Sequence, residues 1–305
     1  MNILDAIGNT PMVELTNLWD SDYTGVRILL KLEGSNPGGS VKDRPALFML
    51  KDAIERGLLT NKKTILEPTS GNTGIGMSMV AAALGYRIKI IMPGCVSEER
   101  RAIMTALGAE VELTPGCDRT DGAIRRAHHI ISEFSDLYFM PNQFASEANW
   151  KSHYCTTAPE IIRDTEGDVQ YFVAGMGTTG TLMGCSRYFR ENHGSTKVVG
   201  VEPTINHRIQ GLKNMSEAIV PPIYQPSLLD QKVICSDEDA FETVRDLSTR
   251  EGIFCGISSG AAVKAAINLA KDLPRGSTIV ALLPDRGDRY LSTEIFRSIC
   301  ADCPP

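Results

Sequence analysis

Several features that would place a chain in a membrane or outside the cell are missing from this sequence of 305 residues. No apolar run approaches the roughly 20 residues that a membrane-spanning helix requires. The first residues lack the basic start and the long apolar stretch of a secretory signal peptide. We therefore expect a cytoplasmic protein that does not associate with membranes.

The chain also lacks an excess of positive charge, and few of its cysteines are paired in the sequence. The net charge is −6, and this balance gives no indication of nucleic-acid binding. The eight cysteines are scattered, which suits reduced thiols. Only Cys300 and Cys303 form a C-x-x-C pair, and a zinc site needs about four ligands. We interpret that pair as two free thiols in a frayed tail, and we expect no metal site.

What the chain does contain is an ordinary globular composition, 42% hydrophobic and 22% charged. Short apolar runs predict strands at 27–31, 64–67, 87–92, 110–113, 137–140, 171–174, 197–202 and 279–283. Helical patterns lie between them at 45–56, 74–84, 97–107, 121–134, 180–190, 237–251 and 260–271. This alternation predicts an α/β fold with parallel sheets. The stretch 203–232 is the least regular and is expected to be a functional loop.

Two glycine- and threonine-rich loops each follow a predicted strand and open a predicted helix. The loop 69–74 (TSGNTG) directs hydroxyls and backbone N–H groups to a helix N-terminus, which favours an anion; a plain turn with capping side chains explains it equally well. The loop 175–181 (GMGTTGT) lacks the Gly-Lys-Ser/Thr of a Walker loop and the dinucleotide fingerprint. A phosphate cradle is the better interpretation. A similar turn at 256–262 gives only a weak signal.

Lys42 lies in a third glycine-rich segment, 36–44 (NPGGSVKDR). Most lysines are solvated surface charges. Here the rigid Pro-Gly-Gly turn and the apolar residues that follow favour a lysine at a buried junction, where desolvation lowers its pKa, as a Schiff-base lysine requires. An aldehyde for the lysine and a phosphate for the loops occur together in pyridoxal phosphate (PLP). Asn72 adds an amide suited to a ring oxygen.

Together these motifs resemble the cysteine synthase family, the PLP-dependent β-replacement enzymes of fold type II. The resemblance runs from 7–11 (IGNTP) to 285–293 (DRGDRYLST), and the latter run and 180–184 are similar to the B-type branch. It implies a tryptophan synthase β-like architecture of two α/β domains with mostly parallel central sheets and PLP between them. Residues 1–42 plus 145–305 would form the larger, PLP-binding domain, and 43–144 a smaller domain that closes over the substrate. A homodimer is also implied.

The resemblance assigns roles to individual residues. Lys42 would hold PLP and then act as the acid and base at the substrate Cα, Asn72 would bind the ring hydroxyl, and Ser258 the pyridine nitrogen. The phosphate would lie against Gly177, Thr178, Thr179, Gly180 and Thr181. The substrate carboxylate would be bound by Thr69, Ser70, Thr73 and Gln143. A neutral serine at the ring nitrogen suits elimination from Cβ, where little carbanion accumulates.

The implied reaction makes L-cysteine from O-acetylserine and sulfide through an aminoacrylate. The segment beginning at Gly211 resembles the region where some relatives bind O-phosphoserine or thiosulfate, the latter giving S-sulfocysteine. Lys213, with Arg208, would contact such an anion, although a solvated loop lysine is an equal alternative. Gly211 and Lys213 are therefore expected to bind substrate.

Other activities of the same fold remain open at this point. A serine or threonine dehydratase would release pyruvate without sulfide, and a cystathionine β-synthase would use homocysteine. An alternative from a different functional class is a non-catalytic protein that binds serine acetyltransferase. The intact Lys42 and ligand loops argue against this alternative.

Overall fold

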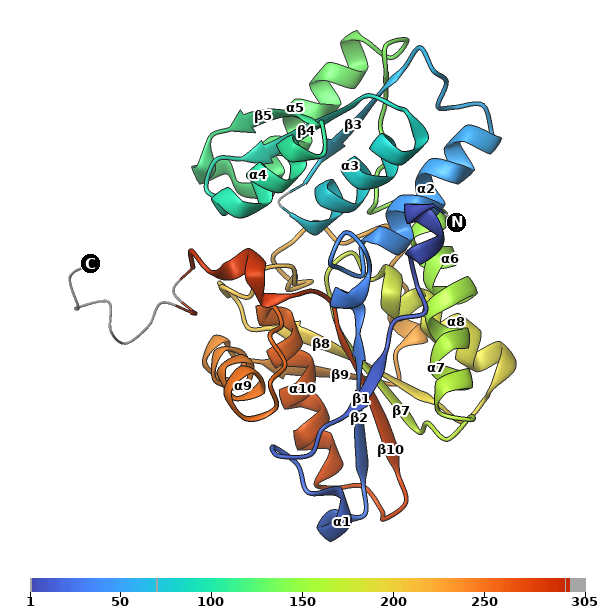
Figure 1. Cartoon of the computed structure of the whole chain (residues 1–305), viewed down its shortest axis with the longest axis vertical. Coiled ribbons are helices and arrows are strands. Elements are labelled where there is room, and N and C mark those ends of the chain that lie inside the picture. Colours follow the sequence, from blue (N-terminus) through green and yellow to red (C-terminus); the bar gives the residue numbers. More distant parts are fainter. Residues whose placement is uncertain (1, 70, 294, 297–305) are drawn as a thin grey trace, which may run out of the picture.

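The computed structural model describes residues 2–69, 71–293, 295 and 296, and it contains two β-sheets, each flanked by helices (Figure 1). Figure 1 shows the four-stranded sheet and its helices at one end of the molecule and the six-stranded sheet at the other. None of the described helices is long and apolar enough to cross a membrane.

The six-stranded sheet is parallel except at one edge. Its order is β1 (Met12–Glu14), β2 (Arg27–Leu32), β10 (Thr278–Leu283), β7 (Tyr171–Gly175), β8 (Lys197–Pro203) and β9 (Gln231–Cys235). Only β1 pairs antiparallel, with β2. The side chains of β7 alternate between two cores, since Val173 packs with helices α9 and α10 while Phe172 and Ala174 pack with α7 and α8. Burial on both faces explains the continuous apolar runs.

The helices around this sheet come from three parts of the chain. Their bounds are α1 (Ser21–Thr24), α6 (Glu147–Ser152), α7 (Ala158–Asp164), α8 (Gly180–Asn192), α9 (Asp237–Arg250) and α10 (Ile257–Ala270). A π-helical turn, His153–Thr157, joins α6 to α7. Such turns are often found at functional sites.

The four-stranded sheet is wholly parallel, in the order β5 (Glu110–Thr114), β4 (Ile88–Pro93), β3 (Thr64–Pro68) and β6 (Tyr138–Phe139). One face packs against α2 (Asp43–Glu55), α3 (Asn72–Leu84) and α4 (Glu98–Ala106), and the other against α5 (Arg119–Glu133). All its strands fall between Thr64 and Phe139. The division into 1–42 plus 145–305 and 43–144 stays a prediction.

The α/β class and the mostly parallel sheets are confirmed, and each of the eight predicted strands is present with small shifts of its ends. The expectation that 203–232 is irregular was wrong at both ends, since Pro203 is the last residue of β8 and β9 begins at Gln231 and forms an exposed sheet edge. The short edge strand β1 and helices α6 and α7 were not predicted. Thr156, Thr157 and Pro159 disfavour an isolated helix, and tertiary packing overrides that preference here.

Short 3-10 turns complete the described chain. They are Ile3–Ala6, Glu33–Ser35, Gly116–Asp118, Pro226–Leu228 and Gly287–Tyr290. The last of these belongs to the segment after β10 that lies against α4, because Ser97 Oγ donates to the Arg289 carbonyl at 3.3 Å and Glu99 accepts from Ser292 Oγ at 2.9 Å. This segment therefore joins the six-stranded sheet to the helices of the four-stranded sheet.

Candidate active site

Lys42 is the residue immediately before α2, in the segment that connects β2 to this helix. The Val41 N–H donates to the Pro284 carbonyl at 2.8 Å, which fixes this segment against the end of β10. The Lys42 side chain is half-buried. Burial lowers the pKa of its amine, although the charges of Asp285 and Glu33 oppose the shift. A lowered pKa increases the neutral, nucleophilic fraction of the amine.

Helix α3 brings Asn72 to the same region. A Cβ added at Gly76 of this helix would lie 3.0 Å from the Lys42 carbonyl oxygen, so the glycine permits the close approach. Asn72 Nδ2 donates to Asp285 Oδ2 at 2.6 Å, and Asn72 Oδ1 accepts from Arg289. Arg289 also donates to the Gly38 carbonyl, in the turn before Lys42. Lys42 and Asn72 are thus held near one another by the segment after β10.

The loop between β7 and α8 has the form of an anion cradle. Thr179 has a φ of 66° and precedes the first residue of α8, and its Oγ1 is buried with no hydrogen-bond partner among the described residues. A Cβ at Gly177 would lie 2.5 Å from the Gly211 carbonyl oxygen. This loop fits a phosphate group because it combines a helix N-terminus, glycine backbone and a buried hydroxyl that can donate a hydrogen bond.

Two residues behind this loop were not predicted from the sequence. Asn149 Nδ2 donates to Thr178 Oγ1 at 3.2 Å, and a Cβ at Gly180 would collide with Asn149 Oδ1. His153 lies between Thr181 and Thr157, at 3.3 and 2.9 Å. Burial lowers the pKa of His153, and the nearby positive charges of Arg44 and Lys42 lower it further, so the imidazole is neutral. Only the contacts made in the fold reveal either residue.

The loop after β3 forms the next part of the site. Thr73 Oγ1 donates to Gln143 Oε1 at 2.7 Å, and the Gly71 N–H donates to Thr69 Oγ1 at 3.2 Å. Gln143 is linked to the loop at 175–181 through Asn149, whose Nδ2 donates to the Gln143 carbonyl at 2.6 Å as well as to Thr178 Oγ1. Thr69, Thr73 and Gln143 therefore lie together. Ser70, the fourth residue predicted here, lies outside the described residues.

Ser258 is buried in the first turn of α10. It lies beside Gly211, where an added Cβ would be 4.0 Å from Ser258 Oγ. The segment with Gly211 also contacts the loop at 175–181, since the Lys213 N–H donates to the Met176 carbonyl at 2.7 Å. The structure therefore brings the loop at 175–181, Gly211 and Ser258 to one place.

The Lys213 side chain is half-buried and does not extend freely into solvent. Its Nζ lies 4.8 Å from the centre of the Phe144 ring, next to Gln143 in the chain. Burial lowers the pKa of its amine, opposed by Asp121. Arg208 points elsewhere, toward α9, where it pairs with Asp237 at 3.2 Å and lies over Phe241.

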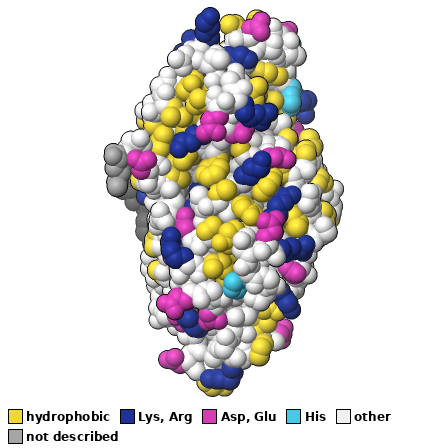
Figure 2. Space-filling model, turned by 90° about the vertical axis from the view of Figure 1, so that its right-hand side faces the viewer, with side chains coloured by type: hydrophobic (Ala, Val, Ile, Leu, Met, Phe, Trp, Pro, Cys, Tyr) yellow, Lys and Arg dark blue, Asp and Glu magenta, His cyan; other side chains and the backbone are white. Residues whose placement is uncertain are grey.

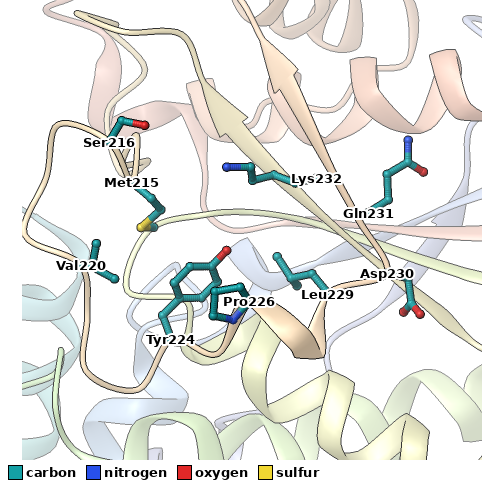
Figure 3. A pocket seen from close by; sticks show the side chains of 9 residues that line it. All are labelled: Met215, Ser216, Val220, Tyr224, Pro226, Leu229, Asp230, Gln231 and Lys232. Atoms are coloured by element: carbon teal, nitrogen blue, oxygen red, sulfur yellow. The ribbon is translucent and has the colours of Figure 1, made fainter.

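A surface pocket of about 540 Å³ lies at the β8–β9 edge of the larger sheet (Figure 3). It is lined by Met215, Ser216, Val220, Tyr224, Pro226, Leu229, Asp230, Gln231 and Lys232. None of these belongs to the predicted site, and Lys232 is engaged by Glu202 at 2.7 Å. The residues predicted for the site therefore lie apart from this pocket. Within the described residues, no group of three or more His, Cys, Asp or Glu could hold a metal; Cys300 and Cys303 lie outside them.

Comparison with known proteins agrees with this geometry. Residues 3–285 match the family described as pyridoxal-phosphate dependent enzyme. The chain is 45% identical to cysteine synthase B of Salmonella typhimurium, over 97% of this chain and 96% of that protein. It is 42% identical to cysteine synthase of Aquifex aeolicus, with 96% and 91% covered.

Solved structures of similar chains superpose over nearly the whole length. They include an O-ureido-L-serine synthase (TM-score 0.91, 40% identity, 97% and 95% covered) and the cysteine synthase of Entamoeba histolytica (0.92, 39%, 97% and 90%). A third is the O-acetylserine dependent cystathionine beta-synthase from Helicobacter pylori (0.89, 37%, 97% and 98%).

The fold and the matched family define a PLP-dependent enzyme of fold type II. The chain belongs to the pyridoxal-phosphate-dependent enzymes and, within them, to the cysteine synthase family. The predicted cofactor is confirmed at this level, and the cradle around Thr179 fits its phosphate.

Proposed function

We propose that this enzyme makes L-cysteine by β-replacement, from an O-activated L-serine and sulfide, with O-acetylserine as the default donor. The observation that carries the proposal is the half-buried Lys42, of lowered pKa, close to Asn72 in a chain 45% identical to cysteine synthase B. PLP, when bound, supplies the electron sink and the aldehyde that the lysine needs.

Lys42 is the covalent anchor and the proton carrier in this proposal. An amine of lowered pKa is neutral in a larger fraction of molecules, so it can take the proton from the substrate Cα. Asn72 is assigned the hydrogen bond to the ring hydroxyl. The neutral hydroxyl of Ser258 is offered to the ring nitrogen, where it does not enforce protonation as a carboxylate would.

The substrate carboxylate is assigned to the loop at 69–73 and to Gln143. Support comes from the N-terminus of α3, which favours an anion, and from the cluster of Thr69, Thr73 and Gln143. Ser70 is assigned the same role from its position in the motif. These residues orient the substrate so that its Cα proton faces Lys42, which lowers the entropic part of the barrier.

Lys213 is the proposed determinant of donor choice, together with Gly211. Its half-buried amine lies beside Phe144, and the charge of Asp121 acts on it. A positive charge there suits an anionic donor such as O-phosphoserine or an anionic sulfur source such as thiosulfate. We expect Lys213→Ala to reduce kcat/KM for O-phosphoserine more than for O-acetylserine, with Lys232→Ala as the control. Equal losses on both donors would remove this role.

A homodimer is proposed for the assembly. On the face that carries α6 and α8, apolar side chains run down the middle with charged groups on either side (Figure 2). Trp150 and Tyr154 stack edge to face there, with centroids 6.3 Å apart, and Tyr154 stacks on Tyr188 at 5.5 Å. Such a surface suits a second copy. Light scattering during gel filtration of the wild type and of Tyr154→Glu tests this. A cytoplasmic location is proposed with it.

The activity is tested by incubating the purified, PLP-loaded protein with O-acetylserine and sulfide and measuring cysteine. Lys42→Ala should lose this activity and the absorbance of the lysine-bound cofactor, whereas the exposed Lys51→Ala should keep both. Pyruvate release without sulfide would indicate a dehydratase, and faster reaction with homocysteine a cystathionine β-synthase. A wild-type protein that binds no PLP would leave only a non-catalytic role, such as a partner of serine acetyltransferase.

A further inference from the structure

Glu67 is a buried carboxyl group that the proposed chemistry does not use. It lies near the end of β3, with only Pro68 between it and the loop at 69–74, and is 1% exposed. Its Oε1 accepts a hydrogen bond from Gln143 Nε2 at 3.0 Å. Its Oε2 is buried with no hydrogen-bond partner among the described residues. An ionised carboxylate in this position would lack compensation for its lost hydration.

The charged groups on the elements packed around β3 are engaged elsewhere. Lys89 on β4 pairs with Glu110 and Glu112. Arg126 on α5 pairs with Glu112, Arg125 with Asp118, and Arg100 on α4 donates to Gln210. Burial therefore raises the pKa of Glu67, to about 8, with the hydrogen bond from Gln143 opposing it only in part. The carboxyl is neutral at pH 7.

The hydrogen bonds of Glu67 fix the orientation of the Gln143 amide. Nε2 of Gln143 faces Glu67, and Oε1 of the same amide accepts from Thr73 Oγ1 at 2.7 Å. An amide has two N–H groups on its nitrogen, so one remains available.

We propose that Glu67 is a positioning residue for the substrate carboxylate, acting through Gln143. It holds the amide so that one N–H is free for the substrate, and as a neutral group it adds no negative charge behind that site. The inference rests on the proposed role of Gln143 and Thr73. When Glu67 ionises, its charge lies one side chain away from the substrate carboxylate and weakens its binding.

The test compares wild type with Glu67→Gln, which keeps the acceptor for Gln143 and cannot ionise. The dissociation constant of L-alanine, which has no leaving group on Cβ, is measured from the absorbance change of the holoenzyme between pH 6.5 and 9.5. The ratio of the two proteins' constants cancels the titration of the ligand and of Lys42. It should be near one at pH 7, with the wild type about tenfold weaker at pH 9, one pH unit above the pKa. A ratio independent of pH overturns the proposal.

Two further measurements separate this role from a structural one. Glu67→Leu removes the acceptor and should weaken L-alanine binding at pH 7, while PLP affinity stays within about twofold of wild type; a large loss of PLP affinity instead overturns the proposal. Difference infrared spectra should show a protonated carboxyl band that disappears as the pH rises through about 8 and is missing in Glu67→Gln. If L-alanine causes no absorbance change in the wild type, the proposed carboxylate site and this inference both fail. If L-alanine binds but the ratio of the two dissociation constants does not change with pH, only this inference fails.

Discussion

Asn149 and Thr178 are joined by a hydrogen bond of 3.2 Å, and the same amide nitrogen of Asn149 donates to the Gln143 carbonyl at 2.6 Å. Thr178 belongs to the loop proposed to hold the PLP phosphate, and Gln143 to the site proposed for the substrate carboxylate. A single buried side chain therefore sets the spacing between the two sites.

Asn149→Ala should weaken PLP binding about five- to tenfold, because the loss of a buried hydrogen bond costs about 1 kcal/mol and leaves the Gln143 carbonyl without its donor. Titration of the apoprotein with PLP, followed by absorbance, measures this. Asn192→Ala removes an exposed bond to the Tyr188 carbonyl and should leave the affinity unchanged. If both variants bind PLP as the wild type does, Asn149 does not position the loop.

Gly177→Ala should reduce PLP affinity about tenfold or more. The new methyl group would lie 2.5 Å from the Gly211 carbonyl, a backbone atom that cannot turn aside, and overpacking of this kind costs about 1–3 kcal/mol. Gly94→Ala is the matched control, since its methyl group would meet only the Thr114 carbonyl at 3.4 Å. Equal PLP affinities for both variants would show that the loop at 175–181 can shift away from Gly211 without affecting PLP binding.

Much of the fold was predictable because its central strands are buried on both faces. The apolar runs of β10 and β8 give a signal that needs no knowledge of their neighbours. The edge strands β1 and β9 have three and five residues and are partly exposed, so their sequences do not differ from loops. They are strands because β2 and β8 offer free hydrogen-bonding groups.

The residues of the candidate site also differ in how far the sequence alone could predict them. Lys42, Asn72 and the glycine-rich loops were identified since their residue types carry a local requirement, such as a glycine where the backbone must approach another segment. Glu67 and Asn149 have no such signal. Their roles depend on contacts with Gln143, which lies far from Glu67 in the chain, and only the folded arrangement supplies these contacts.

Arg44→Met should lower the free energy of unfolding by about 3–5 kcal/mol. Arg44 is buried two residues after Lys42 and pairs with Glu33 at 2.7 Å and Glu160 at 2.6 Å. Its removal leaves the buried Glu33 without a cationic partner and leaves Glu160 with Lys31 alone. Urea unfolding followed by tryptophan fluorescence measures the change. The exposed pair of Arg56 with Asp52 gives the contrast, because Arg56→Met should cost about 0.5 kcal/mol or less. Similar losses of unfolding free energy in both variants would show that burial does not make the ion pairs of Arg44 more important for stability.

The same network predicts how stability depends on acid. Burial alone would raise the pKa of Glu160, but the hydrogen bond and charge of Arg44, with Asn9 and Lys31, lower it to about 2 from an ordinary value of 4.5. The folded protein thus binds this proton more weakly than the unfolded chain does. The stabilisation of the folded protein by ionised Glu160 is fully present above about pH 4.5 and is lost as the pH falls toward 2.

Glu160→Gln tests this prediction because glutamine cannot titrate. The wild type should be more stable than the variant at pH 6, and the difference in the free energy of unfolding should shrink by about 2 kcal/mol between pH 6 and pH 3, since each pKa unit corresponds to about 1.4 kcal/mol. Urea unfolding at four pH values gives the curve. Glu55→Gln, at an exposed position outside the network, should follow the wild type at every pH. A constant difference between the wild type and Glu160→Gln would mean that Glu160 carries no proton-linked stability.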